Sequence, residues 1–166
     1  MDEKNIEGPP LHKIIELCAR GFTTIDGAWY TAVEDVYGPE AALELDLRAW
    51  EVYSGRHAKR VIETYGLTGN DIRTLMEALE LDPFNSVLKP QSRLVKADHG
   101  IMRFTDCPPQ RARIRSGRGE HPCKPVGLVW MSKYAQAVNP EIKVSCIVCP
   151  PDFHPPDCWC EWEFKL

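Results

Sequence analysis

The sequence predicts an α+β protein, in which an N-terminal helical half packs on a small antiparallel sheet with a Cys-rich C-terminal hairpin. Apolar residues recur at helical spacing in the first half, and short β-rich segments bounded by turn residues follow in the second. The chain has 166 residues, the size of one ordinary domain. We expect a flexible tail over 1–8 and a single domain over 9–166, divided into a helical half (9–82) and a mixed, Cys-rich half (86–166).

The first half contains four predicted helices. Apolar residues spaced by three or four, bounded by Gly, Pro and capping residues, place them over 11–22, 25–37, 39–65 and 71–81. The break between the first two depends on Thr23 and Thr24, which can cap the second helix. Gly66 ends the third helix and Asn70 can cap the fourth.

The second half reads as short strands around one helix. Residues 94–97 and 101–105 flank turn residues and predict a β-hairpin. Residues 107–125 are rich in Pro, Gly and Arg and predict a loop with at most one helical turn. The remaining elements are a helix and two strands, over 124–138, 142–148 and 159–164.

Charge and hydropathy limit the classes of partner. Twenty Lys and Arg against twenty-four Asp and Glu give a net charge of -4, which argues against nucleic-acid binding driven by bulk charge. No apolar run approaches the ~20 residues of a membrane span, and the acidic N-terminus lacks the apolar core of a signal peptide. We therefore expect a cytoplasmic protein with a small-molecule ligand, no membrane partner and either a monomeric or a homodimeric state.

Six of the seven cysteines fall in residues 107–166, which points to a metal site or to thiol chemistry. A C-x-x-C pair ends one predicted strand, and two further cysteines begin the strand that should pair with it. Another cysteine precedes a helix, where the helix dipole favours a thiolate. The predicted metal ligands are Cys123, Cys146, Cys149 and Cys160.

Several alternatives to this ligand set stay open. Strand alternation places Cys158 and Cys160 on the same face, so Cys158 is the first reserve and Cys107 the second. His121 or His154 could replace one thiolate. Four thiolates suit tetrahedral zinc, and an iron–sulfur cluster takes the same donors. The other interpretations are reduced structural thiols and a redox protein.

The segment from Cys149 to Phe164, with its C-W-C-E-W-E-F ending, resembles the C-terminal end of 4-vinyl reductase-type domains. In phenol-sensing regulators of that group, zinc is held by a Cys, an acidic residue and a Cys three apart, and a last Cys in the final strand. The resemblance implies zinc on Cys123, Cys149 and Cys160, with Cys146 in place of the acidic ligand.

The motifs D-G-A-W-Y, V-E-D-V-Y-G and A-A-L-E-L-D, in residues 26–46, are similar to those of an uncharacterised bacterial and archaeal family. Members of that family are often described as similar to L-2-amino-thiazoline-4-carboxylic acid hydrolase. The resemblance extends from about residue 20 to the end of the chain. It implies, as an alternative function, hydrolysis of a small cyclic C–N compound.

The helix over 39–65 carries polar residues on its predicted apolar face. Asp46, Trp50, Tyr53 and His57 are spaced by four, three and four, so they share one stripe, while charged residues occupy the opposite side. With Trp29 on the preceding helix, these residues predict a pocket for a small aromatic or anionic ligand.

The acid and base candidates of this pocket are His57, Asp46 and Glu34. Asp46 and His57 lie about 16 Å apart along the helix axis, so they cannot share one proton or one metal. The alternative interpretation is a structural pair that is satisfied within the protein.

A local basic run lies in the second half and contains Arg111, Arg113, Arg115, Arg118 and Lys124. It could bind a ligand that carries a carboxylate or a phosphate. A solvated loop is the simpler interpretation, because few aromatic residues interleave with these charges.

Overall fold

The structure is a computed structural model that describes residue 8 and residues 10–166, so of the predicted tail only Gly8 lies inside the described part. Its elements in chain order are α1 (Leu11–Tyr37), α2 (Pro39–Tyr65), α3 (Ile72–Glu80), α4 (Asn85–Leu88), β1 (Gln91–Lys96), β2 (His99–Phe104), α5 (Pro108–Arg115), α6 (Lys124–Val138), β3 (Lys143–Val148) and β4 (Cys160–Lys165). The predicted α+β class is confirmed. None of the helices described has both the length and the apolar character that crossing a bilayer requires.

α1 is one helix, and the predicted break at Thr23 and Thr24 is wrong. The Thr23 hydroxyl donates to the carbonyls of Ala19 and Arg20, at 3.2 and 2.9 Å, and the Thr24 hydroxyl donates to Arg20 at 2.8 Å. Each hydroxyl therefore bonds to the preceding turn instead of capping a new helix. The helix continues to Tyr37.

The two sides of α1 are both rich in apolar residues, but only one side packs against the protein. Ala19, Tyr30 and Val33 are buried. The other side leaves large apolar side chains in solvent: Leu11, Leu17, Ile25, Trp29 and Val36. Helical spacing of apolar residues identified the helix correctly, and it could not tell which of the two rows faces the core.

α2 confirms both the predicted helix and its predicted inner face. Trp50 and Val61 are buried, whereas the charged residues on the opposite side are exposed: Glu44, Arg48, Glu51 and Lys59. Gly66 ends the helix in the left-handed conformation, with φ 65°, which Gly adopts without a steric penalty.

The four strands form one antiparallel sheet in the order β1-β2-β4-β3. The Cys-rich hairpin of β3 and β4 is therefore present, and β4 also pairs with β2. The β1–β2 turn comes earlier than predicted, so His99 and Gly100 already belong to β2. A Cβ on Gly100 would lie 2.9 Å from Ile72, so glycine lets α3 pack closely on this strand.

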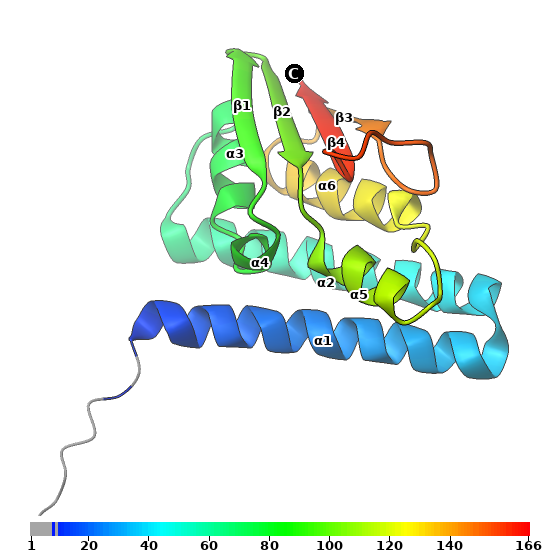
Figure 1. Cartoon of the computed structure of the whole chain (residues 1–166). Helices are drawn as coiled ribbons and strands as arrows, with labels where there is room; N and C mark the ends of the chain where they lie inside the picture. Colours follow the sequence, from blue (N-terminus) through cyan, green and yellow to red (C-terminus); the bar gives the residue numbers. More distant parts are fainter. Residues whose placement is uncertain (1–7, 9) are drawn as a thin grey trace, which may run out of the picture.

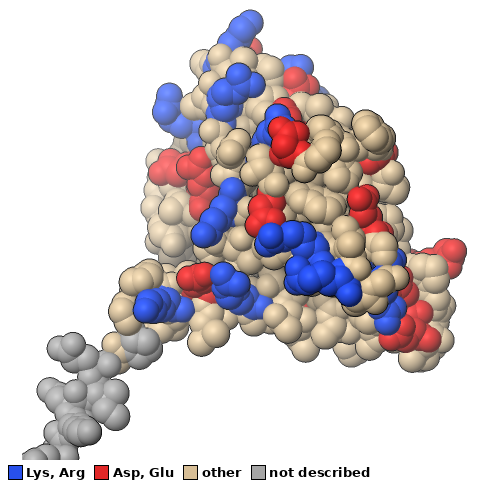
Figure 2. Space-filling view, viewed as in Figure 1, with Lys and Arg blue, Asp and Glu red and all other residues tan. Residues whose placement is uncertain are grey.

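Two smaller expectations are corrected by local hydrogen bonds. Asp71, not Asn70, caps α3, because its carboxylate accepts from the Thr74 backbone N–H at 2.9 Å. The predicted loop over 107–125 contains an eight-residue helix, α5, which begins at Pro108 in the first-turn position that proline favours. Figure 2 shows Lys and Arg side chains gathered over the position of α5.

The layers are stacked in a simple order (Figure 1). α3 and α6 lie against the sheet, α2 packs on α6, and α1 packs on the side of α2 away from the sheet. α5 runs from the end of β2 down to α1. The helical pair α1–α2 is therefore the layer farthest from the sheet.

Candidate functional site: a cavity with thiol and carboxyl groups

A cavity of about 930 Å³ lies between the α1–α2 pair and the α5, α6 and β4 elements. Its aromatic walls come from six parts of the chain: Tyr30, Trp50, Phe84, Phe104, Trp130 and Trp162. Trp130 touches both Trp50 and Phe84, with ring centroids 5.8 and 5.2 Å apart. Its polar groups include thiols and carboxyl groups, described next, and the guanidinium groups of Arg113, Arg115 and Arg118.

Close packing between α6 and β4 brings the thiols to this cavity. A Cβ on Gly127 would lie only 2.5 Å from the Trp162 ring, so glycine allows the first turn of α6 to rest on that indole. The Lys124 N–H also donates to the Pro150 carbonyl at 2.9 Å. Together these contacts hold the N-terminal end of α6 against the segment that follows β3.

Three of the predicted ligands converge there. Cys123 directly precedes α6, Cys149 follows β3, and Cys160 begins β4. The Cys123 and Cys149 sulfurs lie 3.5 Å apart, and Cys149 is also hydrogen-bonded to Cys160. All three line the cavity. We call Cys123, Cys149 and Cys160 the thiol cluster.

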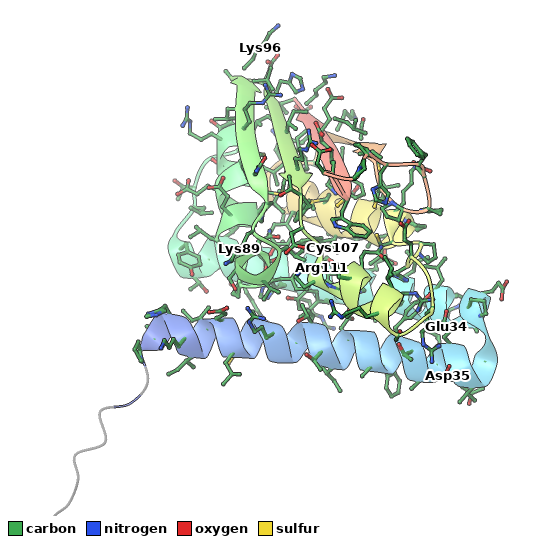
Figure 3. All side chains as sticks on the ribbon, viewed as in Figure 1. Glu34, Asp35, Lys89, Lys96, Cys107 and Arg111 are labelled. Carbon is green, nitrogen blue, oxygen red and sulfur yellow. The ribbon has the colours of Figure 1, made fainter. Side chains whose placement is uncertain are left out.

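Two other cysteines flank the thiol cluster, and two lie elsewhere. Cys107 lines the same cavity at the start of α5, where Figure 3 shows it between the sheet and the helices below. Cys146, on β3, does not line the cavity. Cys158 precedes β4 and points to Glu161 at 4.0 Å, so the shared face expected for Cys158 and Cys160 is not formed. Cys18 is exposed on α1.

The thiols differ in acidity because their surroundings differ. Hydrogen bonds with the Cys149 thiol and the Gln110 amide lower the pKa of Cys123, against the effect of burial. The hydrogen bonds to Cys123 and Cys160 raise the pKa of Cys149. Burial raises the pKa of Cys107 to about 12 and that of Cys146 to about 11. In the metal-free protein, Cys123 is therefore the thiol that ionises most readily of these four.

Gln110 holds Cys123 in place and was missed by sequence reasoning, because its segment was read as a loop. Its side-chain N–H group donates to the Cys123 sulfur at 3.3 Å and to the His121 carbonyl at 2.8 Å. Its side-chain oxygen accepts from the His121 N–H at 2.8 Å. This buried amide therefore ties α5 to the segment before α6.

The thiol cluster meets one geometric requirement of a zinc site, the sulfur separation, but its sulfurs do not surround one metal position. Sulfur atoms around a tetrahedral zinc ion lie about 3.8 Å apart, close to the separation found between Cys123 and Cys149. Within residues 10–166, no set of three or more His, Cys, Asp or Glu side chains is already arranged around one metal position. A bound ion would therefore require the remaining sulfurs to move toward that pair.

Two carboxyl groups face the cavity from neighbouring helices. Asp26 lies on α1 and Asp46 on α2, and Trp50 lines the same cavity. Burial, and then the charge of Asp26, raises the pKa of Asp46 to about 7. Burial also raises the pKa of Asp26. Like charges that are close together in a poorly solvated space favour binding of a proton.

His121 completes this polar group from the other side of the cavity. Its Nε2 atom lies 3.8 Å from the Asp46 carboxylate, and its ring packs edge-on against Tyr30 at 4.4 Å. Burial, and then the nearby Arg113, lowers the pKa of His121 to about 4. The imidazole is therefore neutral at physiological pH.

Of the five residues predicted to bind a ligand, two line the cavity and three do not. Asp46 and Trp50 line the cavity. Tyr53 and His57 lie outside it, stacked on each other at 4.9 Å, with His57 Nε2 3.5 Å from the buried Asp82. Trp29 is 68% exposed and does not line the cavity.

The basic run is largely committed to ion pairs. Arg113 donates twice to Glu34, at 2.9 and 2.6 Å, and Arg118 pairs with Glu34 and Asp35. Figure 3 shows these two acids at the end of α1 that meets the segment after α5. These contacts lower the pKa of Glu34, so this candidate acid stays ionised at neutral pH. Arg111 pairs with Asp106.

The two candidate histidines occupy different places. His121 contacts Asp46, as described above, whereas His154 lies 3.3 Å from Glu120 and packs on Trp159. Asp26 was missed as a site residue because the predicted break in α1 placed it in a helix start. One signal could have found it: Ala19, Phe22, Asp26, Tyr30 and Val33 form a regular row of spacing three or four.

The fold and the site define a small α+β protein with a large cavity lined by aromatic, thiol and carboxyl groups. A family model matches residues 6–166, and the chain belongs to that family, a family of unknown function (DUF6125). No curated protein and no solved structure matches the chain significantly. The match agrees with the expectation of an uncharacterised family and names neither the thiazoline hydrolase nor the 4-vinyl reductase group.

Proposed function

We propose that this protein binds a small organic molecule in the cavity between α1–α2 and α6–β4. The cavity itself is the observation that carries the proposal, because its volume of about 930 Å³ falls in the range of ligand pockets, roughly 300–1,000 Å³. Apolar and aromatic walls with a few convergent polar groups are typical of such pockets. The rings of Trp50, Trp130 and Trp162 favour a ligand with a flat, aromatic body.

The second part of the proposal assigns the cysteines a metal. Cys123, Cys149 and Cys160 would hold a zinc ion with Cys146 as fourth ligand, and Cys107 is the alternative fourth ligand. Four thiolates around zinc make a closed, structural site. Such a site would link the start of α6 to β3 and β4, and would thereby stiffen one wall of the cavity.

The binding proposal is tested by filling the cavity. Gly27 lines the cavity on α1, and a Cβ added there meets no atom within 4 Å, so Gly27→Phe should fold and occupy part of the space. Gly21→Phe is the matched control, because Gly21 lies on the same helix, has the same free space and does not line the cavity. Ligand-observed NMR with a set of aromatic fragments should show saturable binding to wild type and Gly21→Phe.

Loss of that binding in Gly27→Phe supports the cavity as the binding site. The proposal is wrong if no aromatic fragment binds, or if the fragments bind Gly27→Phe as well as they bind the wild type. Thermal melting of both variants gives the check on folding.

A hydrolase is the second candidate function, and the Asp26–Asp46 pair favours it. Asp46 titrates near neutrality and lies beside a neutral imidazole, so it could exchange a proton with a bound substrate. The resemblance to thiazoline hydrolases points in the same direction. Incubation with L-2-amino-thiazoline-4-carboxylic acid should then yield product with wild type and none with Asp46→Asn; absence of product from the wild type rejects this substrate.

A redox or iron–sulfur protein is the third candidate, favoured by the 3.5 Å contact between Cys123 and Cys149. An iron–sulfur cluster would colour an anaerobic preparation brown, and zinc would leave it colourless. The visible spectrum and elemental analysis of the same sample separate these two metals.

A further inference from the structure

The acids at the centre of the cavity have no cationic partner. Asp26 and Asp46 are partly buried on facing helices, and no Lys or Arg in residues 10–166 forms an ion pair with either. Burying a carboxylate costs free energy unless a positively charged partner compensates it. A cationic ligand would supply that compensation for this pair.

The arginines around the cavity do not compensate these two carboxylates. Arg113 and Arg118 line the cavity but bind the Glu34 carboxylate, and Arg20 binds Glu16 at 2.8 Å on the surface of α1. Each of these guanidinium groups is held by an acid outside the central pair. Arg115 also lines the cavity, and no ion pair joins it to Asp26 or Asp46. No arginine of the cavity wall within residues 10–166 therefore forms an ion pair with these two acids.

The other groups that face the pair also suit a cation. Tyr30 on α1 and Trp50 on α2 present aromatic rings to the cavity, and such rings attract positive charge. His121, from the segment before α6, places its Nε2 atom 3.8 Å from the Asp46 carboxylate. Arg113 on α5 lies over the Tyr30 ring, and Glu34 neutralises its charge.

We propose that Asp26 and Asp46 together bind a protonated nitrogen, an amidinium or ammonium group, on a ligand with an aromatic body. This inference rests on the proposed binding function and adds the chemical class of the ligand. An amidinium can donate one N–H to each carboxylate, so a planar cation between the two helices would satisfy both acids at once. The aromatic walls would hold the rest of the molecule.

Three probes of the same shape test the charge preference. 2-Naphthamidine is cationic, 2-naphthamide is its neutral isostere, and 2-naphthoate is anionic. By isothermal titration calorimetry at pH 7.5, we expect naphthamidine to bind at least tenfold more tightly than either of the others. Its affinity should rise between pH 5.5 and 8, because the cation displaces the proton that the pair holds at low pH.

Isosteric variants test the residues. Asp46→Asn and Asp26→Asn should each bring the affinity for naphthamidine to within about threefold of that for naphthamide, and leave naphthamide binding unchanged. Asp35→Asn is the matched control, because Asp35 also lies on α1 at the cavity but pairs with Arg118. If one variant fails to fold, the other still tests the pair.

The outcomes separate this inference from the proposed function. If naphthamide binds and naphthamidine binds no more tightly, the cation preference is wrong and the binding function stands. An advantage for naphthamidine that survives in both Asn variants also overturns the inference. If none of the three probes binds and the aromatic fragments also fail to bind, the proposed function is wrong as well.

Discussion

The sulfur atoms of Cys123 and Cys149 lie 3.5 Å apart, although 26 positions separate the two residues in the chain. One sulfur precedes α6 and the other follows β3, so this contact joins the helix layer to the sheet. Cys160, from β4, joins the same group. A metal ion or other group bound by these thiols would therefore affect the junction of α6, β3 and β4, which forms one wall of the cavity.

The first prediction concerns metal content. We expect about one zinc per chain in untagged protein purified anaerobically. Cys149→Ser should lose the zinc and lower the melting temperature, because a structural ion contributes directly to folding free energy. Inductively coupled plasma mass spectrometry and thermal melts, with and without a chelator, measure both. Cys18→Ser, exposed on α1, is the control that should keep its zinc; a full zinc content in Cys149→Ser would contradict the assignment.

The second prediction identifies the fourth ligand. Cys146 and Cys107 flank the thiol cluster from the strand side and the cavity side. We expect Cys146→Ser to lose zinc and Cys107→Ser to retain it, measured in the same metal analysis. The reverse result would move the fourth ligand to Cys107 and place the ion at the cavity wall.

The third prediction uses the acidity of Asp46. Its pKa is about 7 in the folded protein, whereas an aspartate in an unfolded chain titrates near pH 4. Between these values the folded state binds more protons than the unfolded state, so stability falls as the pH rises through this window. Asp46→Asn should remove this loss and be more stable than wild type at pH 8, by at most about 4 kcal/mol.

Urea denaturation at pH 5 and pH 8 checks this sign. The difference between Asp46→Asn and wild type should be small at pH 5, where Asp46 is already protonated, and larger at pH 8. Glu63→Gln is the control, because Glu63 is an exposed acid on the same helix. An equal difference at both pH values would show that Asp46 ionises normally in the folded protein.

The fourth prediction concerns Asp82, a fully buried carboxylate that accepts from the Tyr134 hydroxyl at 2.6 Å and from the Phe84 N–H at 2.8 Å. Removing the hydroxyl leaves a buried charge with one donor fewer. Tyr134→Phe should therefore lower the free energy of unfolding by roughly 1.5–3 kcal/mol. Tyr37→Phe, which changes an exposed side chain, should have little effect in the same urea titrations. Equal stability of the two variants would contradict a structural role for this hydrogen bond.

Local signals were sufficient for several elements. The helices over 39–65 and 124–138 match α2 and α6, because Gly, Pro and Asn stop a helix by backbone chemistry that does not depend on packing. The same reasoning failed at Thr23 and Thr24, because a Thr hydroxyl can either cap a helix or bond to the preceding turn inside one. Only the position of the neighbouring helix decides between these two uses.

Local sequence patterns likewise predicted some residues of the candidate site and not others. Spacing along the chain indicated Cys123, Cys149 and Cys160, because a hairpin and a helix start restrict where those sulfurs can go. It also indicated Cys146, and it did not choose between Cys158 and Cys160. Spacing on α2 was enough to select Asp46 and Trp50, but it also selected Tyr53 and His57. One face of the 27-residue helix α2 contacts two different environments, and helical periodicity cannot distinguish them.

By itself, the sequence determined the class of the fold, the inner face of α2 and the group of cysteines that meet, since each depends on short-range geometry. Only the tertiary structure decided that Asp26 and Asp46 line one cavity, that His121 lies beside Asp46, and that the thiol cluster opens on the same cavity. These relationships join segments up to a hundred positions apart. They arise from the packing of α1–α2 against α6 and β4, which no local pattern encodes.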